Sequence, residues 1–185
     1  MRRWEDKSRR VTCVTCDVEI SDAEDVRHTE EIFHLFDAYG VKATFFLLLS
    51  PQTCELLESS SILSHVDNHE FGLHIHWGQT QGRDLSYPRG LRWVPVELLE
   101  KEMKYGLESC RRLGLRPRSF RAGGLCQTTT ALKLISRYGF HVDSSVASGL
   151  NESEGYFQGH QRVPFRSWYF PSKLGYDIAA LRNED

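Results

Sequence analysis

The chain has 185 residues, 40% of them hydrophobic and 26% charged, and its net charge at pH 7 is −2. This length suits one domain with a substantial core and is too short for two domains of ordinary size. The small net charge gives no basis for a nucleic-acid partner, and no apolar run is long enough for a membrane span. We expect a single domain over residues 1–185, with a basic tail at 1–10 and an irregular segment at 147–185.

The N-terminus is basic, as in a signal peptide, but the apolar run after it is short and soon meets Asp17 and Glu19. No signal peptide is therefore evident. The 5 cysteines are odd in number and scattered, which fits reduced thiols better than a disulfide framework. These features predict a cytoplasmic protein. Cys13 and Cys16 are three residues apart on a predicted strand, so their sulfurs would face opposite ways and are not expected to share a site.

The first half of the chain alternates predicted strands and helices. A strand at 11–18 precedes a helix that a capping box, Ser21-x-x-Glu24, would start and Gly40 would end. Residues 41–48 are apolar on both faces, as in a strand covered on both sides. A weaker helical pattern follows at 51–66, and residues 70–77 alternate as a third strand.

The second half repeats this order after a polar segment, 79–93, which we interpret as a long loop. A helix runs from Pro95 to Gly114, a strand spans 118–122, a helix spans 128–138 before Gly139, and a fifth strand spans 140–146. The recurring order of helix, glycine and short strand is typical of βα units and a parallel sheet.

Two histidines stand out in the third strand. His74 and His76 are two residues apart, so they share one face and lie close enough to bind one ion. Asp17 and Glu19 share a face at the end of the first strand, and a carboxylate would complete the ligand set. The alternative interpretation is that the histidines are structural and the two acids are surface charge at a strand end.

The carboxyl ends of parallel strands are where ligand sites form in such sheets. The two acids, the two histidines, Arg121 and Asp143 all fall at or near those ends. For Asp143 alone, a turn or cap role is favoured over a catalytic one. The coincidence of the others at one edge favours a metal site.

Several motifs together resemble those of the polysaccharide deacetylases, the NodB-type carbohydrate esterases. They are Thr15-Cys16-Asp17-Val18-Glu19, Lys42-Ala43-Thr44-Phe45-Phe46, Glu70-Phe71-Gly72-Leu73-His74-Ile75-His76, Phe120-Arg121-Ala122-Gly123 and Gly139-Phe140-His141-Val142-Asp143-Ser144-Ser145-Val146. The resemblance spans roughly residues 11–146. It implies an irregular (β/α) barrel, here incomplete with about five βα units, and metal-dependent removal of acetyl groups, most readily N-acetyl, from a sugar or polysaccharide.

The resemblance also implies roles for individual residues. Asp17 matches the general base and Arg121 the residue that orients it. Glu19, His74 and His76 would bind a divalent metal, zinc by preference. Gly123 would offer a backbone N–H to the oxyanion. Apart from the resemblance, Trp77 and Trp93 offer rings on which a sugar substrate could stack, although packing in the core or tail is the more usual role of such aromatics.

Three departures from the family pattern matter. Val18 stands where the metal-binding acid usually does, and the histidines are two rather than four residues apart. The late histidine that protonates the leaving amine has no match, because His160 lies in a glycine-flanked segment without strand character. We therefore expect the chain to lack the closing strands, and an unclosed barrel of this kind to self-associate.

Two alternatives stay open at this point. One is a non-catalytic carbohydrate-binding or scaffold protein that keeps the fold without turnover. The other is a metal-dependent hydrolase of cyclic amides, since the same fold hosts that chemistry.

Overall fold

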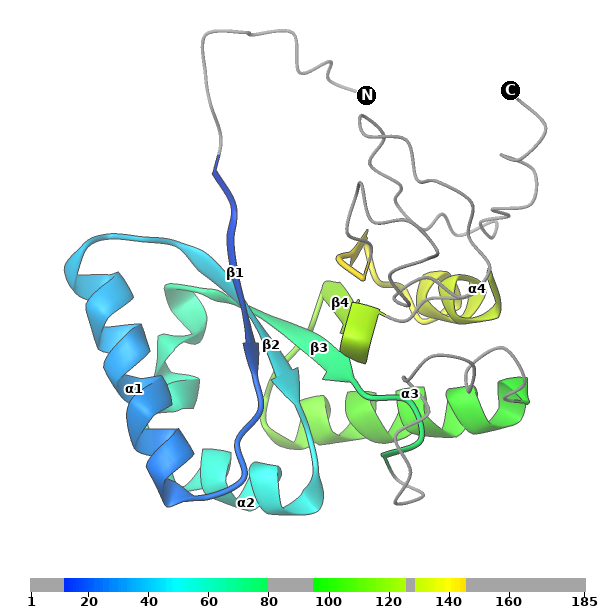
Figure 1. Ribbon diagram of the computed structural model, residues 1–185, viewed down its shortest axis with the longest axis horizontal. Helices are drawn as coiled ribbons and strands as arrows, with labels where there is room; N and C mark the ends of the chain where they lie inside the picture. Colours follow the sequence, from blue (N-terminus) through cyan, green and yellow to red (C-terminus); the bar gives the residue numbers. More distant parts are fainter. Residues whose placement is uncertain (1–11, 80–94, 126–128, 146–185) are drawn as a thin grey trace, which may run out of the picture.

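The structure is a computed structural model that describes residues 12–79, 95–125 and 129–145. Strands and helices alternate along these segments (Figure 1). In chain order they are β1 (Val14–Val18), α1 (Ala23–Ala38), β2 (Ala43–Leu48), α2 (Pro51–Glu58), the 3-10 helix η1 (Ile62–Asp67), β3 (Glu70–Ile75), α3 (Val96–Arg112), β4 (Ser119–Ala122), the 3-10 turn η4 (Gly123–Leu125), α4 (Thr129–Arg137) and β5 (Val142–Asp143).

The strands form one 5-stranded sheet in the order β1-β2-β3-β4-β5, and every pairing is parallel. This confirms the predicted α/β fold of about five βα units. Gly40, Gly114 and Gly139 follow α1, α3 and α4 with φ of 63°, 74° and 84°, so the predicted order of helix, glycine and strand is also confirmed.

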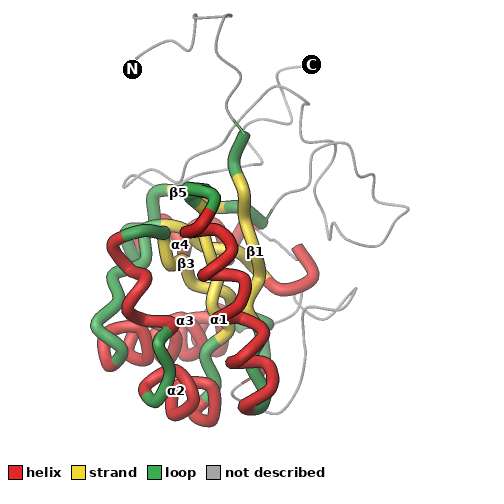
Figure 2. The backbone as a smooth tube through the Cα atoms, turned by 90° about the vertical axis from the view of Figure 1, so that its left-hand side faces the viewer, coloured by secondary structure: helices red, strands yellow, loops and turns green. Residues whose placement is uncertain are grey.

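One face of the sheet carries the core. Phe71, Leu73 and Ile75 alternate along β3 and point to this face, as strand geometry requires. The ring of Phe33 in α1 lies 5.6 Å from that of Phe71, and a Cβ placed on Gly106 of α3 would be 3.1 Å from Leu73. The helices α1 and α3 therefore cover the same face, and the side view in Figure 2 shows both beside the strands.

The opposite face carries the polar residues. His74 and Gly72 of β3 share this face with Ser119 of β4 and Phe46 of β2, since a Cβ on Gly72 would lie 2.6 Å from both Ser119 Oγ and the Phe46 ring. Glycine at this position lets the Phe46 ring lie directly over the β3 backbone. Side chains along each strand thus alternate between the helix-covered face and the opposite face, which is available for chemistry.

Some predicted boundaries are wrong. The N-cap of α1 is Asp22 rather than Ser21, because the Asp22 carboxylate accepts hydrogen bonds from the backbone N–H groups of Glu24 and Asp25. The single helix expected at 51–66 is split into α2 and η1. The fifth strand is confined to Val142–Asp143. The loop expected at 79–93 lies almost wholly outside the described residues.

None of the helices in the described segments has the length and apolar character needed to cross a membrane.

Candidate metal centre

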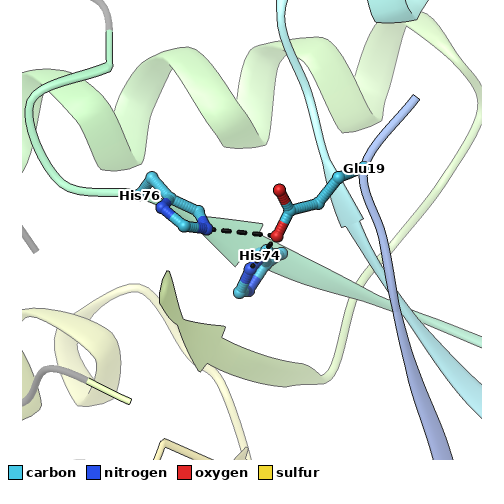
Figure 3. Close-up of side chains that lie close together, drawn as sticks. All are labelled: Glu19, His74 and His76. Carbon is cyan, nitrogen blue, oxygen red and sulfur yellow. Dashed lines mark hydrogen bonds and ion pairs between the residues drawn. The ribbon is translucent and has the colours of Figure 1, made fainter. Parts of the chain in front are cut away.

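The ends of β1 and β3 bring three predicted ligands together. Glu19 follows the last residue of β1, His74 lies in β3, and His76 follows the last residue of β3. Glu19 Oε1 is 3.4 Å from His74 Nε2 and 3.2 Å from His76 Nε2 (Figure 3). One ligand atom from each residue lies within 4.8 Å of the others, which is the spacing that a single cation requires.

The protonation state of His74 follows from its partner. Its Nδ1 lies 2.8 Å from the carbonyl oxygen of Arg121, and a carbonyl only accepts, so Nδ1 carries the proton and donates. In the neutral ring, Nε2 then presents a lone pair toward Glu19 Oε1. Two acceptors this close repel each other unless a cation lies between them. The donor set therefore fits a divalent metal.

Burial keeps His74 in the form that binds a metal. Its side chain is only 2% exposed, and this burial lowers the pKa of His74 below the ordinary value of 6.5. The backbone bond from Nδ1 also fixes the orientation of the ring, as outer partners of metal-binding histidines usually do. The imidazole is thus neutral near pH 7 and preoriented.

Gly123 lies against the other histidine. A Cβ at this position would collide with the ring atoms of His76, so only glycine lets η4 approach the ring so closely. This contact gives Gly123 a role that is visible in the structure, namely making room for His76. Its predicted role as an oxyanion donor stays a prediction.

The predicted base and its predicted partner form an ion pair. Arg121 Nη1 donates to Asp17 Oδ1 over 2.7 Å, with the arginine side chain 13% exposed and the aspartate 39% exposed. Two further contacts were missed from the sequence, because Arg121 Nη2 also donates to Thr15 Oγ1 and to Ser144 Oγ. Thr15 could have been found by its strand parity, which it shares with Asp17.

The stacking role expected of Trp77 is wrong. Its side chain is fully buried, and its ring centroid lies 5.8 Å from that of Phe120 in the core. A ring enclosed in this way offers no face to a sugar. The other predicted stacking residue, Trp93, lies outside the described residues.

A second group of acid and histidines lies near the opposite ends of the strands. Asp37 Oδ2 is 2.7 Å from His65 Nδ1, and its Oδ1 is 3.2 Å from His69 Nε2. However, His69 Nδ1 accepts the backbone N–H of Ala43 over 3.3 Å, so in the neutral ring Nε2 carries the proton. His69 then has no lone pair to give to a cation. In this tautomer the group, unlike the first, does not present three lone pairs to one cation.

The cysteines within the described segments are free thiols. Partial burial, which is the largest effect, together with the charge of Asp17 raises the pKa of Cys16 above its ordinary value, so its reactive thiolate form is disfavoured at neutral pH.

The chain superposes on solved carbohydrate esterases. One is a family 4 carbohydrate esterase from Streptomyces lividans in complex with acetate, with a TM-score of 0.52 and 17% sequence identity over 77% of this chain. The chain has the fold of this family. A family 4 pseudoenzyme from Bacillus anthracis matches with a TM-score of 0.53 and 15% identity over 71% of this chain. A mutant of that pseudoenzyme with restored enzymatic activity matches with a TM-score of 0.53 and 16% identity over 71% of this chain.

The matches span only part of these carbohydrate esterases. They cover 64% of the Streptomyces protein, 42% of the Bacillus pseudoenzyme and 43% of its mutant. Comparison with protein-family models and with curated proteins finds no match. At these identities the likeness establishes the fold, and the chemistry has to be argued from the residues of this chain.

Proposed function

We propose that the protein is a metal-dependent deacetylase that hydrolyses acetyl groups, N-acetyl by preference, on a sugar or polysaccharide. The observation that carries this proposal is the pair of clusters on one sheet face. Glu19, His74 and His76 form a group that could hold a metal ion. Asp17, which lies on β1 two residues before Glu19, is held by Arg121. A metal-binding group beside an oriented carboxylate is the arrangement that hydrolysis of an amide or ester requires.

Two imidazoles and one carboxylate are the protein ligands of many catalytic zinc sites, which favours zinc among divalent metals. When bound, such a metal polarises the carbonyl oxygen of the acetyl group and makes water more acidic. Glu19, His74 and His76 would hold it. The exposed side of Glu19, whose side chain is 50% exposed, leaves the group accessible to a substrate.

The other residues have distinct roles in the proposed reaction. Asp17 accepts the proton of the attacking water as general base, and Arg121 orients the carboxylate through the 2.7 Å bond to Oδ1. The backbone N–H near Gly123 stabilises the charge that develops on the carbonyl oxygen. No residue in the described segments is assigned to protonate the leaving group.

The test is acetate release from N-acetylglucosamine oligomers, with and without a chelator. We expect release by the zinc-loaded protein, its loss on chelation and its recovery on adding zinc back. Asp17→Asn should lower turnover by at least about a hundredfold, the lower end of the contribution of a general base, while zinc still binds. Glu31→Gln, on the exposed face of α1, is the matched control and should retain activity.

A second candidate is a non-catalytic carbohydrate-binding protein with the same fold. The pseudoenzyme among the structural matches favours considering it. Tight zinc binding and oligosaccharide binding without acetate release would support this candidate. Ammonia or ring-opened product from cyclic amides, without acetate, would instead point to a cyclic amide hydrolase.

A further inference from the structure

Arg121 is held on several sides, not only by Asp17. Its Nη2 lies 2.8 Å from Thr15 Oγ1 and 2.7 Å from Ser144 Oγ, and its Nε lies 3.3 Å from the carbonyl oxygen of Ser144. Its Cζ sits 4.3 Å from the centroid of the Phe46 ring. The guanidinium therefore stacks on the Phe46 ring, and its edge donates hydrogen bonds to two hydroxyl groups.

The contact with Asp17 explains why this support matters. It is a single bond from Nη1 to Oδ1 rather than a two-pronged pair. One bond at the end of a long side chain leaves the guanidinium free to pivot about Asp17, and an arginine side chain has much rotamer freedom to lose. The bonds from Nη2 and Nε fix the plane of the group and so fix the direction from which Asp17 is held.

These supports come from three different strands or their ends. Thr15 lies on β1 two residues before Asp17, Phe46 lies on β2, and Ser144 follows β5. Ser144 is itself anchored, because its backbone N–H donates to the carbonyl oxygen of Phe120 over 2.8 Å. The last described strand is thereby tied to the first through the arginine.

We propose that Thr15 and Ser144 are positioning residues for the general base and act through Arg121. This inference rests on the proposed function, in which Asp17 is that base. The two hydroxyls hold the guanidinium so that the Asp17 carboxylate keeps a fixed direction. Neither hydroxyl is assigned contact with substrate or metal.

The test compares Thr15→Val with Thr15→Ser and Ser144→Ala. Thr15→Val keeps the side-chain shape and removes the hydroxyl, whereas Thr15→Ser keeps the hydroxyl. We expect Thr15→Val and Ser144→Ala each to lower kcat about tenfold, the value of one hydrogen bond to a charged group, with KM and zinc affinity unchanged. Thr15→Ser should restore most of kcat. Thr44→Val is the matched control, because Thr44 bonds Glu70 instead, and should leave kcat unchanged.

A double-mutant cycle shows whether the effect passes through Arg121. In an Arg121→Ala background, Thr15→Val and Ser144→Ala should have no further effect on kcat. Full, additive losses in that background would overturn the proposal. So would a wild-type kcat in both single variants.

A structural measurement keeps the inference testable if the wild-type protein releases no acetate. The Nε–H of Arg121 should give a slowly exchanging NMR signal in the wild-type protein and in Thr44→Val. Exchange should accelerate in Thr15→Val and Ser144→Ala. Absent acetate release with this pattern rejects the deacetylase function, and with it the role of Asp17 as base, but shows that the two hydroxyls hold the Arg121 guanidinium. Unchanged exchange in both variants shows that they do not hold it and so rejects the positioning role.

Discussion

Glu19 connects both histidines of the metal centre through one atom, Oε1. In the metal-free protein this oxygen faces the lone pair of His74 Nε2, so the arrangement is unfavourable until a cation arrives. The close approach of Glu19 and His74 thus lowers the stability of the metal-free protein and favours metal binding. This loss of stability is measurable, because a side chain at position 19 that can donate a hydrogen bond would relieve the repulsion.

Glu19→Gln tests whether metal binding and the stability of the metal-free protein change in opposite directions. We expect it to weaken zinc binding by at least about 100-fold, since a charged ligand is lost, while the metal-free protein unfolds at an equal or higher temperature than the wild type. Isothermal titration calorimetry and thermal unfolding give the two readouts. The wild-type protein should bind one zinc. Retention of a tight zinc in the variant would indicate that the Asp37 group binds metal after all.

Gly123 offers a second test of the metal centre. Gly123→Ala forces the ring of His76 to move, because the added Cβ would occupy the position of its ring atoms. We expect zinc affinity to fall about tenfold or more, on the scale of lost outer support for a ligand. Titration with zinc in the presence of a competing chelator measures the change. Unchanged affinity would show that His76 is not a ligand.

Strand parity explains which site residues were predictable. His74 and His76 share parity, and so do Asp17 and Glu19, so the sequence was sufficient to place these pairs together. Trp77 has the parity of Ile75, which points to the helix-covered face, and the same rule would have placed it in the core. Core packing, the more usual role of such an aromatic, is the one that Trp77 has in the structure.

Ser144 was beyond prediction for a different reason. It follows a strand of two residues, Val142–Asp143, where no alternation exists from which to read a direction. Its hydroxyl reaches Arg121 only because β5 lies beside β4 in the sheet. Neighbouring Asp143 does cap its own turn, since its carboxylate accepts the backbone N–H of Ser145 over 3.0 Å. The turn role favoured for Asp143 over a catalytic one thus fits its contacts.

At the scale of elements, the start of α1 distinguishes two candidate N-cap residues, Ser21 and Asp22. The predicted capping box makes Ser21 the cap, whereas in the structure Asp22 bonds the first turn and Ser21 bonds the side chain of Asp25. We expect Asp22→Ala to lower the free energy of unfolding by about 1 kcal/mol, the usual value of an N-cap. Urea unfolding of Asp22→Ala and Ser21→Ala compares the two.

Ser21→Ala is the control for Asp22→Ala. Ser21→Ala removes only one exposed hydrogen bond, that from Ser21 Oγ to Asp25, and should cost less than Asp22→Ala. A larger loss for Ser21→Ala would mean that the helix starts one residue earlier. The sequence left this point open because Ser and Asp are equally good caps and adjoin each other here.

For the whole molecule, the Asp37 group predicts how stability depends on pH. Burial, the largest effect, lowers the pKa of His69 below 6.5. Protonation at Nδ1 would also direct two N–H groups at each other, since this atom accepts from Ala43. The unfolded chain therefore takes up this proton more readily than the folded one. Stability should be full above about pH 6.5 and should fall as the pH drops below that value.

Asp37 contributes in a lower range. Burial alone would raise its pKa, but the hydrogen bond and charge of His65, and then those of His69, outweigh burial and lower the pKa below 3.8. Its contribution is present above about pH 3.8 and is lost as the pH falls through the folded pKa. Urea unfolding between pH 7 and 2 measures both ranges.

His69→Gln should flatten the dependence between pH 6.5 and 5, whereas His28→Gln, at an exposed histidine of α1, should not. Charges that face His69 include Asp37, His65 and Lys42, so the slope reports the group as a whole. An unchanged slope in His69→Gln would contradict the assignment.

The parallel βα architecture was predictable because glycine punctuation and apolar runs are local signals. The packing of distant segments was not, as the Asp37 group shows: it joins α1, η1 and the residue before β3, and no short motif links them. The predicted single domain, cytoplasmic location and self-association stay predictions.

One consequence concerns the first strand. In the described sheet β1 is a terminal strand that pairs only with β2, yet the carboxylate of Glu19 reaches past β2 to the histidines of β3. A bound cation would fasten this outer strand to an inner one. Removing the ion should therefore let the amides of β1 exchange with deuterium well before those of β3. Metal binding would then be detected as slower amide exchange in this outer strand.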